Sequence, residues 1–272
     1  MASKAHPQRQ QQLLALLIDA DNASAAIVEG LFEEIAKFGV ASVKRIYGDW
    51  TQPNLGSWKK VLLDYSIQPI QQFAYTRGKN ATDSALIIDA MDLLYTRRFD
   101  GFCLVSSDSD FTRLAARLRE EGLTVYGFGE EKTPKPFVSA CDKFIYTEIL
   151  RADAVEAQPE PASSDDKPQP SVKSEQPDEP LKTPDKPKAQ KVPVDFIAKV
   201  IEDIDDEDGW IQLGSLGSTI SKLRPAFDAR LYGFRKLSDL IKGHPKRFEL
   251  QVRGSSAMGG EALYVRNRKV GK

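Results

Sequence analysis

Hydrophobic and polar positions alternate in blocks along the first 150 residues. Short apolar runs bounded by polar residues are typical of buried parallel strands, and longer stretches with apolar residues every three or four positions are typical of helices. The expected strands are Leu13–Ile18, Val43–Tyr47, Pro69–Ala74, Phe102–Ser106, Leu123–Phe128 and a short edge strand, Lys143–Tyr146. The expected helices are Ala25–Phe38, Leu55–Tyr65, Thr82–Tyr95 and Phe111–Glu121. This alternation predicts an α/β domain with a parallel, Rossmann-like sheet and helices on both faces.

The pattern stops at Arg151. Residues 151–191 contain half of the chain's sixteen prolines, many charged residues of both signs and no aromatic residue. Such a segment buries too little apolar surface to offset the entropy lost on ordering, so we expect a disordered linker that spans about 35–40 Å. The predicted organisation is a flexible leader over residues 1–11, an α/β domain over 12–150, the linker over 151–191 and a second domain over 192–268.

The second domain combines short helices with two late strand patterns. Val194–Ile204 has the spacing of an amphipathic helix, and the β runs Arg247–Val252 and Ala262–Arg266 follow further helical segments. Helices followed by a two-stranded hairpin predict a small winged-helix α+β domain. From Gly209 onward, basic residues far outnumber acidic ones, which indicates a nucleic-acid-binding surface. The candidate phosphate contacts are Arg224, Arg235, Lys236, Lys242 and Lys246.

Composition and charge narrow the range of compartments and partners. The chain has 272 residues and a formal net charge of −1, so any attraction to nucleic acid must come from local patches. Its two cysteines, Cys103 and Cys141, are expected to be reduced thiols. The first twelve residues are polar and lack the apolar segment of a signal peptide, and no apolar run approaches the roughly 20 residues of a membrane span. These features predict a soluble cytoplasmic protein with no membrane partner.

Acidic residues follow two of the predicted strands. Asp19 ends the first strand, and Asp108 and Asp110 follow the fourth strand. In an open α/β sheet, ligands bind beyond the carboxyl ends of the strands. Concentrated carboxylates repel one another unless a cation or shared protons hold them, so these clusters indicate a divalent metal ion.

A third acidic position lies at the start of a predicted helix. Asp83 heads the apolar, core-facing stripe of that helix, so its carboxylate should point back toward the strand ends. Asp89 and Asp92 fall on another face and are expected to be exposed to solvent. Two weaker members keep alternative roles: Asn22 caps a helix or holds a metal-bound water, and Asp110 starts a helix or binds the metal.

Other chemistries lack the residues that they need. The only histidines are His6 and His244, which excludes a histidine-based triad or a histidine-ligated zinc in the first domain. Gly78-Lys79 lacks the other residues of a P-loop, and Gly127-Phe128-Gly129 lacks the third glycine of a dinucleotide fingerprint. An all-carboxylate site remains, and it suits Mg²⁺ or Mn²⁺ and chemistry at a phosphate.

Three motifs in this order resemble the NYN domain family: Ile18–Asn22, Lys79–Asp83 and Val105–Phe111. NYN domains are PIN-like ribonucleases with an aspartate metal site at the C-terminal edge of a parallel sheet. The resemblance covers most of residues 11–150. It implies a catalytic site with one or two Mg²⁺ or Mn²⁺ ions, supported by Asn22 and formed by Asp19, Asp83, Asp108 and Asp110. Lys79, in the second motif, is expected to contact RNA.

Two further segments, Leu213–Gly217 and Tyr232–Ile241, resemble the OST-HTH or LOTUS domain. This second resemblance covers about residues 192–268 and implies RNA binding. We therefore expect a metal-dependent endoribonuclease tethered to an RNA-binding winged helix. One alternative is a non-catalytic RNA-binding adaptor with a vestigial acidic site, in which the winged helix could also read a protein partner. A weaker alternative is an aspartate-based phosphohydrolase, because Asp19-Ala20-Asp21 superficially matches a nucleophile and acid pair, but this leaves Asp83 without a role.

Overall fold

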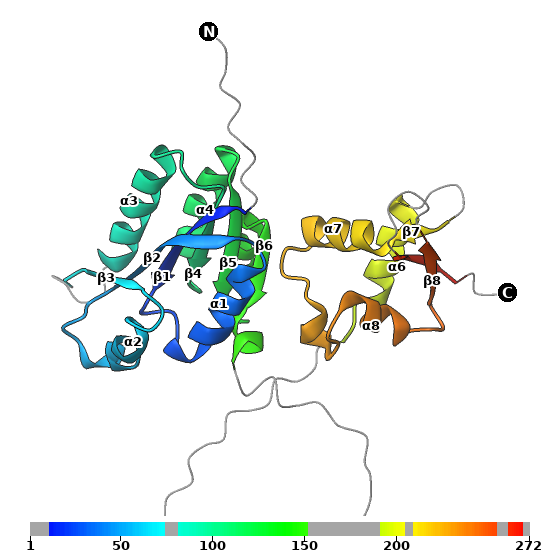
Figure 1. The fold of residues 1–272 in the computed structure, drawn as a ribbon, viewed down its shortest axis with the longest axis horizontal. Helices are drawn as coiled ribbons and strands as arrows, with labels where there is room; N and C mark the ends of the chain where they lie inside the picture. The colour runs from blue at the N-terminus through cyan, green and yellow to red at the C-terminus, as the bar shows by residue number, and fades with distance from the viewer. Residues whose placement is uncertain (1–10, 74–80, 152–190, 205–208, 255–260, 269–272) are drawn as a thin grey trace, which may run out of the picture.

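The fold is described from a computed structural model of the chain (Figure 1). The structure describes residues 11–73, 81–151, 191–204, 209–254 and 261–268. The expected leader and linker lie almost entirely outside these residues, and so does Lys79. No helix in the described part of the chain is both long enough and apolar enough to cross a membrane.

A six-stranded parallel sheet forms the centre of the first domain. Its strands lie in the order β3-β2-β1-β4-β5-β6. Their bounds are β1 (Leu13–Asp19), β2 (Val40–Gly48), β3 (Gln68–Gln71), β4 (Gly101–Val105), β5 (Thr124–Gly129) and β6 (Lys143–Tyr146). The chain moves outward from β1 to β3 and then returns to place β4 on the other side of β1. The switch point between β1 and β4 is where sheets of this kind bind ligands.

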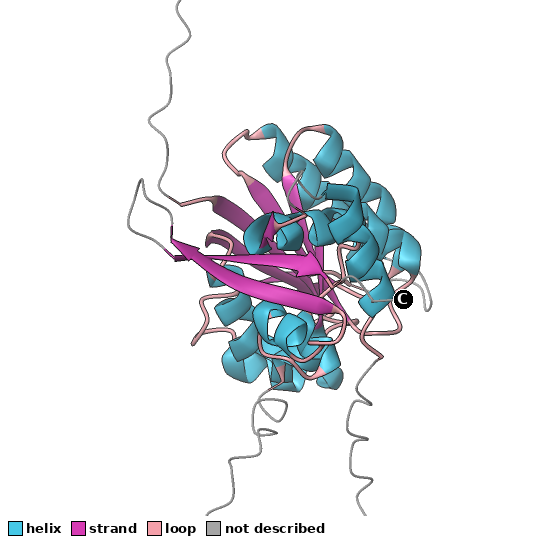
Figure 2. Cartoon of the chain, turned by 90° about the vertical axis from the view of Figure 1, so that its right-hand side faces the viewer, coloured by secondary structure: helices cyan, strands magenta, loops and turns pink. Residues whose placement is uncertain are grey.

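Helices cover both faces of this sheet (Figure 2). One face carries α1 (Val28–Ala36) and α2 (Gly56–Val61), and the other carries α3 (Ala81–Tyr95), α4 (Thr112–Glu120) and α5 (Lys135–Ala140). The fold class predicted from the sequence is confirmed. The helix α5 was missed, because its six residues begin beside Pro134 and include Pro136, which suggest a loop rather than a helical period.

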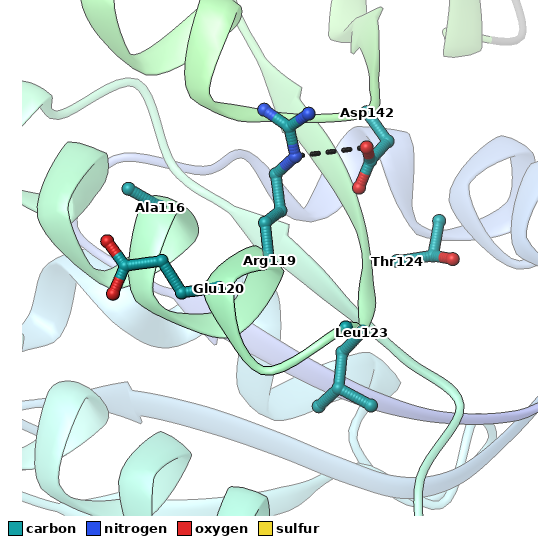
Figure 3. A pocket seen from close by; sticks show the side chains of 7 residues that line it. Ala116, Arg119, Glu120, Leu123, Thr124 and Asp142 are labelled. Atoms are coloured by element: carbon teal, nitrogen blue, oxygen red, sulfur yellow. Dashed lines mark ion pairs between the residues drawn. The ribbon is translucent and has the colours of Figure 1, made fainter.

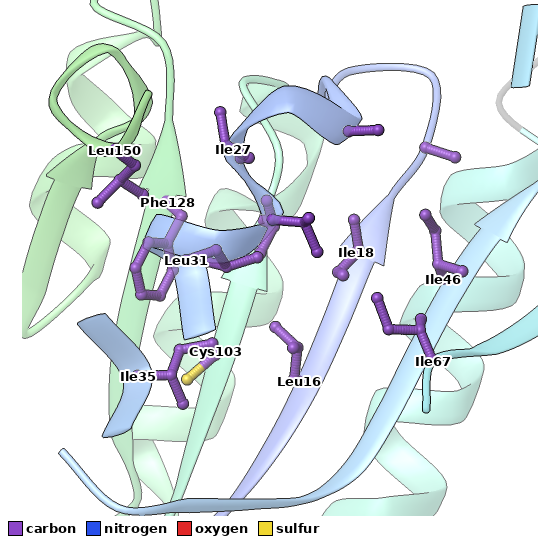
Figure 4. Packing of buried hydrophobic residues seen from close by; sticks show 14 of the residues in the cluster. Leu16, Ile18, Ile27, Leu31, Ile35, Ile46, Ile67, Cys103, Phe128 and Leu150 are labelled. Atoms are coloured by element: carbon purple, nitrogen blue, oxygen red, sulfur yellow. The ribbon is translucent and has the colours of Figure 1, made fainter. Parts of the chain in front are cut away.

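Two separate hydrophobic clusters fill the spaces between the sheet and its helices. Along β1, Leu16 and Ile18 belong to the first cluster, whereas Ala15 and Leu17 belong to the second. Successive side chains of a strand point to opposite faces of the sheet, so the apolar residues of β1 pack against the helices on both faces. Figure 4 shows the first cluster, in which Leu31 of α1 lies over the sheet. β1 is thus buried on both faces and holds its last residue, Asp19, in a rigid position.

The second domain is a small α+β unit, as expected. It contains α6 (Val194–Ile204), β7 (Ile211–Gln212), α7 (Leu213–Leu223), the 3₁₀ turn η6 (Ala229–Tyr232), α8 (Leu237–Lys242), β8 (Phe248–Gly254) and β9 (Glu261–Asn267). The three strands form an antiparallel sheet in the order β7-β9-β8, and β7 was not predicted. Apolar residues of the helices pack on this sheet, with Leu216, Ile220, Leu240 and Val265 fully buried.

Candidate metal centre and nucleic-acid surface

Asp19 lies at the end of β1, in the middle of the sheet, and its side chain is fully buried. Its carboxylate accepts hydrogen bonds from the Asp21 amide (3.1 Å), the Asn22 side-chain amide (2.8 Å) and the Ser106 hydroxyl (2.8 Å). Burial raises the pKa of Asp19 above its ordinary value, although these donors favour the ionised form. Asp19 is therefore held in one orientation by its own protein neighbours.

Three other aspartates converge beside it. One carboxylate oxygen from each of Asp83, Asp108 and Asp110 lies within 4.8 Å of the other two. Asp83 comes from the first turn of α3, and the other two come from the turn between β4 and α4. Asp83 is buried, Asp108 is half-buried and Asp110 is exposed, so the cluster opens toward solvent on one side. Three oxygens at this spacing match the ligand preference of Mg²⁺ or Mn²⁺.

Both burial and the neighbouring carboxylates act on the ionisation of Asp83. Burial, together with the negative charges of Asp19, Asp108, Asp110 and Asp21, raises the pKa of Asp83 to about 6. Like charges in a shared site disfavour ionisation, and a bound cation reverses that effect. The cluster is thus an arrangement that a divalent cation would stabilise.

Comparison with protein-family models identifies the domain that carries these aspartates. The family model for the NYN domain matches residues 13–150, which is half of the chain. The chain belongs to the NYN domain family. The family model for the OST-HTH/LOTUS domain matches residues 185–258, so both resemblances carried by the sequence motifs are confirmed.

Two solved structures are also similar to this chain. One is a protein of unknown function, VPA0982, from Vibrio parahaemolyticus RIMD 2210633, with 18% identity over 53% of this chain and 94% of that chain and a TM-score of 0.42. The other is an uncharacterized protein from gene locus NE0665 of Nitrosomonas europaea, with 35% identity over 38% of this chain and 95% of that chain and a TM-score of 0.30. No curated protein matches the chain.

Ser106 joins two aspartates of the NYN domain, a role that was not predicted from the sequence. Its buried hydroxyl donates to Asp19 and accepts a hydrogen bond of 3.0 Å from the Asp108 amide. The next residue, Ser107, accepts a hydrogen bond of 2.9 Å from the Glu130 amide beyond β5. The sequence feature that could have indicated this role is the position of Ser106, which directly follows the buried strand β4 and lies two residues before Asp108.

The capping roles considered for Asn22 and Asp110 belong to other residues. Ser24 is the N-cap before α1, where its hydroxyl accepts from the Ala26 amide. Asp108 is the N-cap of the turn before α4, where its carboxylate accepts from the Asp110 amide at 2.9 Å. Asn22 instead donates to Asp19, so it orients a carboxylate of the site rather than ending a helix.

The expectation for Asp89 was wrong. Its carboxylate lies under β2 and accepts hydrogen bonds from the Tyr47 hydroxyl (2.8 Å) and the Arg45 guanidinium (2.9 Å). Burial, followed by the adjacent carboxylate, raises the pKa of Tyr47. Asp92 is exposed, as expected. Asp89 therefore ties α3 to the sheet, and this tie supports the helix that carries Asp83.

The predicted phosphate contacts of the OST-HTH domain surround α8. Arg235 and Lys236 precede this helix and Lys242 ends it, while Lys246 follows shortly after; all four are exposed. Within the described residues, none of these four side chains forms an ion pair. Arg224 follows α7, and its guanidinium stacks on Phe196 with 3.8 Å to the ring centroid. These four exposed basic residues flank or end α8, whereas Arg224 packs on Phe196 of α6.

A shallow depression of about 510 Å³ lies where α4 ends and β5 begins (Figure 3). An ion pair of 3.0 Å between Arg119 and Asp142 crosses it. Because this is the end of the sheet where β5 starts, it lies away from the aspartates at the carboxyl ends of the strands. We assign no function to it.

Proposed function

We propose that this protein is a metal-dependent endoribonuclease whose NYN domain cleaves RNA and whose OST-HTH domain holds it. NYN domains are PIN-like nucleases and OST-HTH domains bind RNA, so the pairing favours RNA as the substrate. The observation that carries the proposal is the convergence of Asp83, Asp108 and Asp110 at the switch point of the sheet.

Each member of the site has a distinct part in this proposal. Asp83, Asp108 and Asp110 would hold Mg²⁺ or Mn²⁺, which would stabilise negative charge on the scissile phosphate and favour ionisation of an attacking water. Asp19 lies beside them. One of its oxygens accepts from Asn22 and Ser106 and the other accepts from the Asp21 amide, so we assign it the positioning of the residues that follow β1 and β4 and electrostatic support of the ion.

The proton on Asp83 links metal loading to pH. With a pKa of about 6, its carboxyl is partly protonated in slightly acidic solution, and it must release that proton to become a ligand. Loading should therefore weaken as the pH falls below 6.

RNA affinity is assigned to the basic surface around α8, formed by Arg235, Lys236, Lys242 and Lys246, with Lys79 of the NYN domain and Arg224 as further contacts. The domain limits of 12–150 and 192–268 and the linker between them are part of the same proposal. Both cysteines are free and buried, which suits the proposed cytoplasmic location.

The test is cleavage of a labelled single-stranded RNA by the full chain, with Mn²⁺, with Mg²⁺ or with chelator. Cleavage should require the metal and should be lost in Asp83→Asn. Asp92→Asn is the matched control, because it makes the same change on an exposed face of the same helix. Cleavage that persists unchanged in Asp83→Asn, or in chelator, would refute the proposed site.

A non-catalytic RNA-binding adaptor is the second candidate. The observation in its favour is that the carboxylate of Asp19 accepts three hydrogen bonds from the protein and is fully buried. An adaptor should bind RNA with the same affinity in the wild type and in Asp83→Asn, and it should cleave RNA with neither metal.

A further inference from the structure

The outer strand β6 meets the OST-HTH domain directly. β6 lies at the edge of the sheet, and an edge strand presents unpaired backbone groups on its outer side. There the Phe144 amide donates a hydrogen bond of 2.9 Å to the carbonyl oxygen of Pro225, which follows α7. The neighbouring Ala226 packs against the hydrophobic cluster that contains Phe144. The second domain therefore satisfies an outward-facing backbone donor of the nuclease sheet.

A charged contact lies beside this edge. Glu34 of α1 has a side chain that is only 4% exposed, and it accepts hydrogen bonds from Lys37 (2.6 Å) and Arg230 (2.9 Å). Arg230 belongs to the OST-HTH domain and lies 196 positions away in the sequence. A carboxylate this deeply buried requires compensating partners, and one of its two partners comes from the other domain.

Arg230 is fixed in place before it reaches Glu34. Its Nε lies 3.0 Å from one oxygen of Asp228 and its Nη2 lies 2.6 Å from the other, so the pair is bidentate. These contacts leave Nη1 to reach Glu34. Burial opposes the ionisation of Glu34 and Asp228. Hydrogen bonds outweigh this effect: Lys37 and Arg230 donate to Glu34, and Arg230 donates to Asp228, so the pKa of each carboxyl lies below its ordinary value. Only the planar fork of arginine can serve both carboxylates at once.

We propose that the OST-HTH domain docks on the NYN domain through a specific intramolecular interface, with the Glu34–Arg230–Asp228 bridge as its polar centre and the Phe144–Pro225 contact at its edge. A flexible linker alone would leave the two domains independent. Docking instead fixes the distance between the basic surface around α8 and the aspartate cluster. This interface is independent of catalysis, so its test measures geometry and not activity.

The linker makes a modest interface sufficient. The composition of residues 151–191 predicts a flexible connection. A flexible connection of this length would hold its ends at an effective concentration of about 1 mM, so docking would need only a dissociation constant well below that value. Glu34→Gln removes the carboxylate that accepts from Nη1 of Arg230, while Asp228 still holds the rest of the guanidinium, so the loss falls on the contact between the domains. Glu34→Gln should therefore lower the ratio of docked to undocked molecules by about 10-fold to 100-fold.

The experiment measures the distance between spin labels on the two domains of the full chain. Labels are attached at Lys59→Cys on α2 and Lys222→Cys on α7, which are both exposed, while the two natural cysteines are buried. We expect one narrow distance distribution in the parent chain and a broad distribution in Glu34→Gln. Arg230→Lys, which keeps the charge but loses the fork, should also broaden it. Glu120→Gln is the matched control, because within the described residues Glu120 forms ion pairs only with Arg113 and Arg117 of its own helix, which are exposed or half-exposed.

Each outcome decides for or against the interface. A broad distribution in the parent chain, or a narrow one that survives both Glu34→Gln and Arg230→Lys, would overturn it. A narrow distance that disappears when the labelled chain is diluted into excess unlabelled chain would show contact between two copies, which also overturns an intramolecular interface. Circular dichroism verifies the folding of each variant. If Arg230→Lys unfolds its own domain, Glu34→Gln decides alone, because it lies on the other domain.

Discussion

Asp83 carries the clearest pH-dependent property at the scale of single residues. Its pKa of about 6 lies above the ordinary 3.8, so its ionisation works against folding in the absence of metal. The stability contributed by the neutral carboxyl is fully present below about pH 4 and is lost as the pH rises through 6. With solvent screening allowed for, Asp83→Asn should gain about 1–2 kcal/mol of stability at pH 7.5 in chelator and nothing at pH 4.

Thermal unfolding at a series of pH values measures this gain. Asp92→Asn should change stability by less than about 0.5 kcal/mol at every pH, because it alters an exposed residue. Adding Mn²⁺ at pH 7.5 should raise the melting temperature of the wild type more than that of Asp83→Asn. An equal gain in Asp83→Asn at pH 4 and pH 7.5 would show that ionisation of Asp83 is not its cause.

Ser106 provides a second test at this scale. Ser106→Ala removes a donor to buried Asp19 and the acceptor of the Asp108 amide, so it should cost about 1–3 kcal/mol of stability and reduce the thermal shift produced by Mn²⁺. Ser109→Ala, an exposed serine in the same turn, is the control and should be nearly neutral. Denaturant unfolding compares the two variants, and equal stabilities would contradict the linking role of Ser106.

At the scale of elements, some features were predictable from local sequence and others were not. Asp19 and Asp108 could be placed because Asp19 ends the apolar strand β1 and Asp108 follows closely after the apolar strand β4. The hydrogen bonds of Ser106 to Asp19, and of Tyr47 and Arg45 to Asp89, depend on which strands and helices become neighbours. No local period encodes that information, so the sequence indicated the three aspartates that converge in the structure but not the hydrogen bonds around them.

The helix α1 yields a prediction that contradicts helix propensity. Alanine normally stabilises a helix interior by about 0.5–1 kcal/mol relative to glycine. At Gly30, however, an added Cβ would collide with the Leu150 carbonyl oxygen, which is backbone and cannot move aside cheaply. Gly30→Ala should therefore cost about 1–3 kcal/mol.

Gly217 in α7 is the control for this element, because an added Cβ there meets only ordinary contact, 3.5 Å from Leu237. Gly217→Ala should stabilise the OST-HTH domain by about 0.5–1 kcal/mol. Calorimetry measures the stability of both variants and so separates the effect of close packing at Gly30 from the effect of helix propensity. A stabilising Gly30→Ala would show that α1 and the end of the NYN domain are not packed closely.

At the scale of the whole molecule, composition predicts two domains and a linker, but it cannot predict their docking. Glu34 and Arg230 each resemble an ordinary surface charge in the sequence, and only the assembled fold brings them together. If docking is correct, the aspartate cluster and the basic residues around α8 lie at a fixed spacing, at which both could contact one RNA under the proposed function. RNA affinity should then depend on α8, while metal chemistry should depend on the aspartates.

Salt dependence separates these two contributions. Each phosphate contact to single-stranded RNA adds about 0.7 to the slope of log affinity against log salt, so Arg235→Glu with Lys236→Glu should weaken binding and lower that slope by about 1.4. The control is Arg97→Glu with Arg98→Glu, which changes the net charge equally at exposed positions between α3 and β4, at the end of the sheet away from the aspartates. Affinity for a single-stranded RNA, measured in chelator over a range of salt concentrations, compares both variants with the wild type.

Cleavage at saturating RNA and Mn²⁺ should keep nearly the same rate in the α8 variant, because its metal site is intact. If the α8 variant and the control gave the same affinity and the same slope, the basic surface would not contact RNA, and its exposed lysines and arginines would be better explained as the binding surface for an acidic protein partner.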